Sequence, residues 1–329
     1  MKSNVLTVLD LFESKRRYTV PLFQRQYVWS LEKQWIPLWE DIERRVIDRL
    51  HWYETGRGTD SGSGSPGEHF LGAIVLDHHP TYGKQVPTQL LIDGQQRLAT
   101  CQIILAALRD VAAEHDVPDY PDELQRHLLN SGVMEAPDIE RYKVWPSRFD
   151  QGPFQAIIEA AVKPSDSRSR LVQAYKFFSR ELEDLLMREI LSPRLGTQPD
   201  TYERVKAVFE TFQKDIHIVS IELESQDDPQ IIFESLNARG EPLLPSDLLR
   251  NYLFWRASRE NAADLERLYE DYWRHFDSDF WKKDETQGRL KRPRVDLFFF
   301  NLLQLKTGDE VNAARLYYEY KAWSEHAAP

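Results

Sequence analysis

The chain has 329 residues, of which 41% are hydrophobic and 29% are charged, and its formal net charge at pH 7 is −11. This composition is typical of a globular protein with one large or two ordinary domains, and it excludes a largely disordered chain. The negative charge argues against a protein that coats nucleic acid through bulk positive charge, although a local basic groove stays possible. The single cysteine, Cys101, excludes an internal disulfide and suits a reducing compartment.

The two ends of the chain give expectations about location and completeness. No apolar run approaches the roughly 20 residues that span a bilayer. The start, "MKSNVLTVLDLF", lacks the apolar core and cleavage site of a signal peptide. We therefore expect a soluble cytoplasmic protein with no membrane contact. The end, "WSEHAAP", has no clear closing element, so we expect the front portion of a longer protein.

The first predicted elements precede a Gly/Ser-rich loop at residues 55–68. Residues 5–14 have the apolar spacing of a helix, and residues 17–23 indicate a short strand broken by Pro21. Residues 30–50 predict an amphipathic helix with Ser30 as its N-cap. Pro37 should kink that helix or move its true start to a later residue.

The next elements predict the fold class. Residues 69–77 and 89–93 indicate buried strands, so residues 1–112 predict an α/β core. Residues 113–215 predict a helical insertion, in which residues 169–191 are the most periodic segment. Residues 216–224 alternate between apolar and polar side chains, which predicts a strand that returns to the sheet. A helix-loop-helix follows, and residues 216–255 are expected to complete the pocket. The expected class is therefore α+β: a small sheet with helices, followed by a mainly helical region.

Residues 256–329 predict that helical region, which is rich in aromatic residues and would lead to a further domain. Its segment "KKDETQGRLKRPR", residues 282–294, is strongly basic. We expect a solvated loop there, and contact with DNA phosphates is the alternative.

The most informative segment is "LLIDGQQRLAT", residues 90–100, which turns from a buried strand into a helix. The N-terminus of a helix attracts anions, and Gly94 lets a ligand approach the backbone. Arg97 offers a donor fork for phosphate, and Asp93 could hold magnesium. Gln95 and Gln96 could contact phosphate or an attacking water. The alternative is a turn whose polar side chains only cap the helix, and the residues alone leave the two interpretations balanced.

A second polar run, residues 20–30, directly precedes the helix predicted from residue 30. Gln24 and Arg25 repeat the amide and guanidinium chemistry of the first run, and Tyr27 offers a flat face on which a base could stack. The alternative places Tyr27 in the core and leaves Arg25 solvated. Cys101, which shares its helical spacing with Leu98 and Leu105, is expected in the core rather than in catalysis.

A third polar run lies in residues 231–254, "IIFESLNARGEPLLPSDLLRNYLF". Asn237 and Arg239 fall in a loop between two predicted helices, with Gly240 ending the first and Ser246 capping the second. A purely structural helix-loop-helix explains these caps. It does not explain why Asn237 and Arg239 occur together.

Four segments in this order, "VPLFQRQYVW", "FLGAIVL", "LLIDGQQRLAT" and "IFESLNARGEPLLPSDLLRNYLF", resemble the N-terminal domain of GmrSD-type restriction proteins. These bacterial anti-phage enzymes act on modified DNA, and the group includes sensors of phosphorothioated DNA. The resemblance covers residues 5–255, although residues 113–215 carry no motif of the family. It implies a ParB/sulfiredoxin-like core, hydrolysis of a nucleoside triphosphate (often GTP), and a separate C-terminal His-Asn-His nuclease domain, whose signature this sequence lacks.

The resemblance also implies roles for the polar residues. Asp93, Gln95, Gln96 and Arg97 would act at the nucleotide phosphates, with Asp93 as a ligand of Mg²⁺. The residues that would contact the nucleotide or modified DNA are Gln24, Arg25, Tyr27, Gly94, Asn237 and Arg239.

The expected function is therefore an NTPase, using GTP or ATP, that senses modified double-stranded DNA and controls a nuclease domain of the same protein. A homo-oligomer is also compatible with this expectation. Two alternatives stay open: a module that binds nucleotide or DNA without hydrolysis, and a ParB-like core that itself cuts DNA.

Overall fold

The structure, a computed structural model, falls into two units by its internal contacts. The first comprises Met1–Pro21 and Gln26–Asp227, and the second comprises Leu22–Arg25 and Asp228–Pro329. The residues that the structure describes are 1–21, 24–56, 67–161, 168–190, 198–224, 227, 244–259, 264–288 and 290–326.

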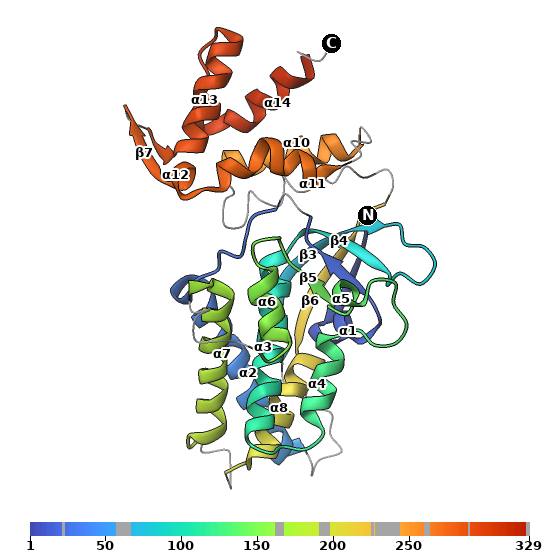
Figure 1. Cartoon of the computed structure of the whole chain (residues 1–329). Coiled ribbons are helices and arrows are strands. Elements are labelled where there is room, and N and C mark those ends of the chain that lie inside the picture. The colour runs from blue at the N-terminus through green and yellow to red at the C-terminus, as the bar shows by residue number, and fades with distance from the viewer. Residues whose placement is uncertain are drawn as a thin grey trace. The chain divides into compact units, whose positions relative to one another are not determined.

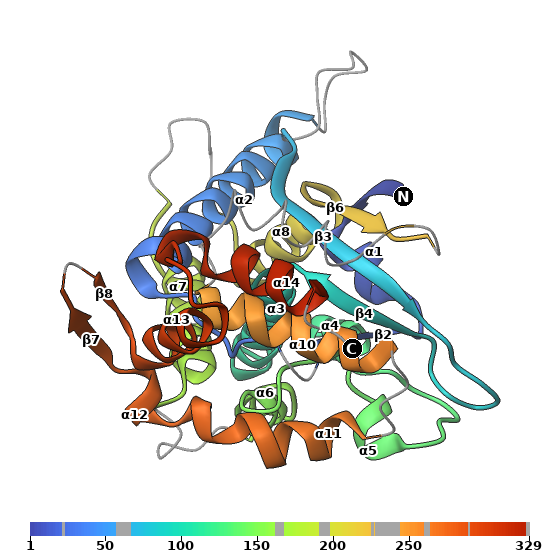
Figure 2. The ribbon, with the colours of Figure 1, turned by 90° about the horizontal axis from the view of Figure 1, so that it is seen from above.

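The first unit contains a mixed six-stranded sheet with the order β1-β6-β3-β4-β2-β5 (Figures 1 and 2). Its strands are β1 (Lys2–Thr7), β2 (Arg17–Thr19), β3 (His69–His79), β4 (Thr88–Asp93), β5 (Val144–Trp145) and β6 (Ile216–Glu222). β3 lies between β6 and β4, parallel to β6 and antiparallel to β4. β4 and β2 are parallel, as are β2 and β5. Because β2 and β4 are parallel, the carboxyl end of β4 and the start of β2 lie at opposite ends of the strands.

Helices pack against this sheet around one central helix, α3 (Figure 1). The helical elements of this unit are α1 (Val8–Glu13), η1 (Leu31–Trp35), α2 (Ile36–Gly56), α3 (Gln95–Glu114), α4 (Tyr120–Leu128), α5 (Pro137–Glu140), α6 (Gln151–Ile158), α7 (Arg170–Met187) and α8 (Thr201–Lys214). α3 contacts α4, α6 and α7, and it is buried around most of its circumference. A helix with apolar residues on every face has to be buried in this way.

Cys101 lies in this buried helix and is 1% exposed, which confirms its predicted core position. Burial raises the pKa of its thiol to about 12, so the reactive thiolate is disfavoured at neutral pH.

The α+β class is confirmed, and so are the strands predicted at residues 69–77, 89–93 and 216–224. The last of these returns to the sheet as β6, as expected. The helix predicted over residues 5–14 is wrong in its first part, because Val5 to Thr7 belong to β1 and pair with β6. The helix starts only at Val8, where Thr7 and Asp10 form a capping box.

Pro37 has the expected effect on the helix predicted over residues 30–50. The α-helix proper, α2, begins at Ile36, so that Pro37 occupies its first turn, where a missing N–H costs little. The preceding residues form the π-helical turn η1, and Ser30 is its N-cap. The side chain of Ser30 makes no cap bond; instead its backbone N–H donates to Oε1 of Gln34 at 2.9 Å.

The second unit is mainly helical and has its own aromatic core, as predicted for residues 256–329. Its elements are α10 (Pro245–Arg259), α11 (Leu265–Leu268), η3 (Tyr269–Trp273), η4 (Arg274–Asp277), α12 (Asp279–Lys282), β7 (Asp284–Gln287), β8 (Leu290–Pro293), α13 (Arg294–Thr307), η5 (Ala313–Arg315) and α14 (Leu316–His326). Trp273 stacks on Phe299, with ring centroids 5.6 Å apart. The prediction of a loop at residues 282–294 is wrong, because β7 and β8 pair there as an antiparallel hairpin. Its strands carry polar residues on both faces, so the apolar alternation that signals a strand is missing.

None of the described helices has both the length and the apolar character that crossing a membrane requires.

Candidate functional site

The corner between β4 and α3 is formed by Gly94. Asp93 is the last residue of β4 and is paired with Val75 of β3, and Gly94 follows with a φ of +94° as the N-cap of α3. A Cβ at this position would lie 2.6 Å from Cγ2 of Ile74. Both the left-handed backbone and this close approach of β3 therefore require glycine. Glycine has no side chain that could cap the helix, and no side-chain cap bond forms at this N-cap.

Arg97, in the first turn of α3, is held against β3. Its Nη1 donates to the carbonyl oxygen of Ala73. A Cβ on Gly72 would lie 3.0 Å from Nη2, and Gly72 has a φ of +106°. Gly72 thus makes room for the guanidinium. Gly72 was not among the residues predicted for the site, although an isolated glycine inside a strand pattern signals a bulge or a close approach.

Gln96 connects the corner to the second polar run. Its Oε1 accepts from the backbone N–H of Val28 at 2.7 Å, and its Nε2 donates to the carbonyl oxygen of Gln26 at 3.2 Å. The side chain is 9% exposed. Both ends of the amide are therefore used to hold residues 26–28 beside the start of α3.

Tyr27 lies within this segment, and its ring is in the core. The residue is 4% exposed, and its hydroxyl is 2.7 Å from Oγ1 of Thr100 and accepts from Nε1 of Trp35 at 3.0 Å. Burial raises the pKa of Tyr27. The backbone N–H of Tyr27 donates to Oδ2 of Asp150 at 2.7 Å. This arrangement matches the core alternative and leaves little of the ring accessible for stacking on a base.

The remaining residues singled out from the sequence fall in other parts of the chain. Gln24 and Arg25 group with the second unit. Asn237 and Arg239 lie outside the described residues. The structure therefore brings together residues 93–97 of the first polar run and residues 26–28 of the second.

The electrostatics of the corner favour an anion. The N-terminus of a 20-residue helix carries a partial positive charge, and Arg97 adds a full one. Helices usually place acidic residues in the first turn to offset the dipole, but the first turn of α3 has none. Asp93, just before the corner, is the nearest acidic residue in sequence.

A magnesium ion fits this donor set only together with phosphate oxygens. Among the described residues there is no group of three or more His, Cys, Asp or Glu side chains arranged for a metal. Mg²⁺ is commonly held by one or two carboxylates plus substrate phosphates and water. Asp93 would supply the carboxylate of such a site.

Comparison with known proteins gives a family. A search of curated proteins finds no match. A family model described as the GmrSD restriction endonuclease, N-terminal domain, matches residues 8–254, which is more than half of the chain. The match includes the whole corner and the segment that Gln96 holds. The chain therefore belongs to the family of GmrSD restriction endonuclease N-terminal domains, which are parts of restriction systems.

Proposed function

We propose that this domain hydrolyses a nucleoside triphosphate, GTP or ATP, and senses modified DNA, with the corner between β4 and α3 as the phosphate site. The observation that carries this proposal is the N-terminus of α3, where Gly94 makes no side-chain cap bond, together with Arg97 in the same turn. Together they concentrate positive potential where a backbone can closely approach phosphate oxygens. The restriction-system family supplies the biological context.

Each residue of the corner would then have its own role in binding or hydrolysis. The first-turn N–H groups of α3 would bind phosphate oxygens, and Arg97 would stabilise the charge that develops during phosphoryl transfer. Asp93 would hold Mg²⁺, which when bound neutralises phosphate charge, and Gln95 would orient the attacking water. Gln96 would act as a positioning residue, because its amide already holds residues 26–28.

Recognition of DNA is the second half of the proposal. Gln24, Arg25, Asn237 and Arg239 would contact the nucleotide or the modified DNA. Amide and guanidinium groups suit both base edges and phosphates. Hydrolysis would then report recognition to a nuclease domain of the same protein.

The experiment is a measurement of phosphate release from GTP and from ATP, with and without phosphorothioated or glucosylated duplex DNA. Arg97→Gln should lower the rate roughly 100-fold or more, since removing a donor to a developing charge costs about 2.7–4 kcal/mol. The matched control is Arg180→Gln, because Arg180 lies on α7 and its side chain is 73% exposed. Circular dichroism would establish that both variants are folded.

Three outcomes separate the possibilities. Unchanged phosphate release by folded Arg97→Gln and Asp93→Asn proteins contradicts the site. Nucleotide-dependent thermal stabilisation without any phosphate release by the wild type indicates a binding module instead. Nicking of a plasmid by this chain with Mg²⁺ alone indicates a nuclease.

A further inference from the structure

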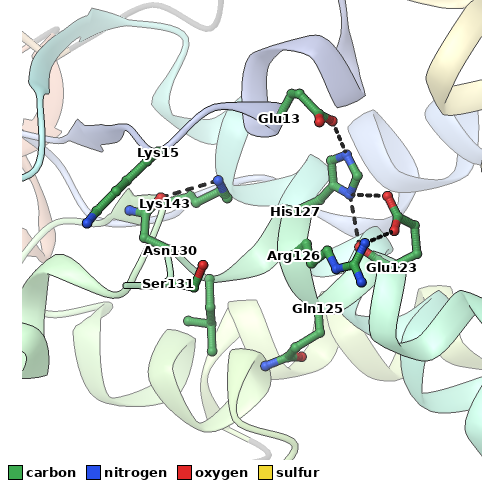
Figure 3. A pocket seen from close by; sticks show the side chains of 10 residues that line it. Glu13, Lys15, Glu123, Gln125, Arg126, His127, Asn130, Ser131 and Lys143 are labelled. Atoms are coloured by element: carbon green, nitrogen blue, oxygen red, sulfur yellow. Dashed lines mark hydrogen bonds and ion pairs between the residues drawn. The ribbon is translucent and has the colours of Figure 1, made fainter. Parts of the chain in front are cut away.

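A second polar pocket lies at the other edge of the sheet in the first unit (Figure 3). β2 runs parallel to β4, with Arg17 opposite Thr88. Residues 13–15, which come just before β2, therefore lie at the end of the sheet where β4 begins. Asp93 lies at the opposite end of β4. The pocket is thus separated from the corner by the length of that strand. Its volume is about 340 Å³, and it is lined by Glu13, Lys15, Glu123, Gln125, Arg126, His127, Leu129, Asn130, Ser131 and Lys143.

Lys143 forms the buried side of this pocket. The residue is only 3% exposed, and its Nζ donates to the carbonyl oxygen of Ser14 at 2.9 Å and to Oδ1 of Asn130 at 3.2 Å. Both acceptors are neutral, and the charge of Glu13 offsets the burial of the ammonium only in part. Among the described residues, this Nζ has no ion-pair partner. A buried charge without an ion-pair partner is costly, and an anion in the adjoining pocket would relieve that cost.

The two acidic residues of the pocket already have basic side chains as partners. Oε2 of Glu13 is 3.1 Å from Nε2 of His127, and Oε2 of Glu123 accepts from Nη1 of Arg126 at 2.9 Å. Nδ1 of His127 faces the carbonyl oxygen of Glu123 at 3.0 Å. Both ring nitrogens of His127 therefore lie at hydrogen-bond distance from an oxygen atom.

The remaining charge of the pocket is positive. Lys15 lies at its exposed rim and donates to the carbonyl oxygen of Val133, a neutral partner. The ammonium groups of Lys15 and Lys143 thus both donate to neutral acceptors. Figure 3 shows Lys15 and Lys143 on one side of the pocket and the acid–base pairs on the other. A doubly charged anion matches these two ammonium groups better than a carboxylate, which carries one charge.

We propose that this pocket, the Lys143 pocket, binds the phosphate dianion of a small molecule between Lys143 at its floor and Lys15 at its rim. The hydroxyl of Ser131 is available for a further phosphate oxygen. The volume accommodates a phosphate together with a small group attached to it. The shared chemistry admits two sources: free inorganic phosphate, or the phosphate of a nucleoside monophosphate. The inference is independent of hydrolysis at the corner.

The test is isothermal titration calorimetry of the whole chain with inorganic phosphate and, separately, with GMP, at pH 7 and constant ionic strength. Sodium chloride at the same ionic strength serves as the salt control. The wild type should bind saturably. Tighter binding of GMP than of phosphate assigns the nucleotide as the source, and the reverse assigns free phosphate.

Three charge-removing variants test the residues. Lys15→Gln should weaken binding roughly 10-fold, which is about 1.4 kcal/mol, because it removes one charge-assisted hydrogen bond. Lys143→Met should abolish binding, and Lys15→Gln decides the question if that variant does not fold. Lys176→Gln, on the exposed face of α7, is the matched control and should bind as the wild type does.

Phosphate or GMP that binds at the corner would keep its calorimetric signal in Lys15→Gln and Lys143→Met, so the binding lost in these two variants belongs to the Lys143 pocket. Unchanged affinity in both variants would overturn the proposal. Absence of saturable binding by the wild type would overturn it as well.

Discussion

The two edges of the sheet in the first unit both favour anions, but by different physical means. At the corner, the positive potential comes from the backbone of α3, whose N-cap glycine makes no side-chain cap bond. Arg97 adds a positively charged side chain there, and Asp93 adds a negatively charged one. In the Lys143 pocket, the potential comes from side chains on several elements, and the buried ammonium is held by neutral acceptors.

This difference determines how each site tolerates change. A backbone site depends on the local conformation, so substitutions that alter the backbone should be the most harmful to it. A side-chain site depends on charge, so substitutions that neutralise a charge should remove binding and leave the fold largely intact. Four predictions test this contrast.

The largest effect is expected for Gly94→Ala. The left-handed conformation costs a non-glycine residue roughly 1–2 kcal/mol, and crowding against Ile74 costs about 1–3 kcal/mol more. The free energy of unfolding, measured by urea denaturation, should fall by about 3 kcal/mol. Gly83→Ala is the control, because Gly83 has a φ of +61° but open space around its Cβ position. It should cost only about 1 kcal/mol. Equal losses in the two variants would mean that close packing against β3 does not constrain the corner.

Gln96→Ala should come next. It leaves the N–H of Val28 and the carbonyl oxygen of Gln26 without their side-chain partner. The expected loss in the free energy of unfolding is about 1–3 kcal/mol. Hydrogen exchange at the N–H of Val28 should accelerate, which distinguishes loss of this clamp from a general loss of stability. Gln213→Ala, on an exposed position of α8, is the control. Unchanged protection of Val28 would show that the clamp does not hold in solution.

Tyr27→Phe should have a smaller effect. The variant removes the hydroxyl that bonds Thr100 and Trp35, at an expected cost of about 1 kcal/mol in the free energy of unfolding. Because the ring is in the core, the KM for nucleotide should stay as in the wild type. Tyr82→Phe, at a residue that is 75% exposed, should change neither quantity. A raised KM in Tyr27→Phe alone would instead favour a role of this hydroxyl in binding.

The fourth prediction concerns the titration of Lys143. Burial lowers its pKa to about 8, with Glu13 opposing and Arg16 adding to the shift. In the unfolded chain the pKa returns to the ordinary value of lysine, about 10.5. Between these two values the unfolded state binds more protons, so this group's contribution makes the protein more stable as the pH rises. Below pH 8 the cost of burying the charge is fully present.

Carbon NMR of the lysine Cε groups, with Lys143→Arg to assign the resonance, measures this pKa directly. Inorganic phosphate should raise the pKa of Lys143, because a bound anion favours the ammonium. An ordinary lysine pKa without phosphate would contradict the structural assignment of Lys143 as a buried charge.

Local sequence patterns predicted most of the sheet and the corner, because their signals are contiguous. Residues 69–77 and 89–93 are mainly apolar runs of strand length, and the polarity of Asp93 to Arg97 marks the start of a helix. β1 was not predicted, because the apolar spacing of residues 5–14 also fits a helix. Residues 5–7 form a strand because they pair with β6, which lies more than 200 residues away in the chain.

The sequence by itself therefore determined the α+β class, the strand-to-helix corner and the family. Only the tertiary structure decided that Gln96 clamps residues 26–28, that Gly72 accommodates Arg97, and that Tyr27 is buried. It alone also assembled the Lys143 pocket, from segments near residues 13, 127 and 143. The physical reason is that contacts between distant segments follow from how whole elements pack, and no local periodicity records them.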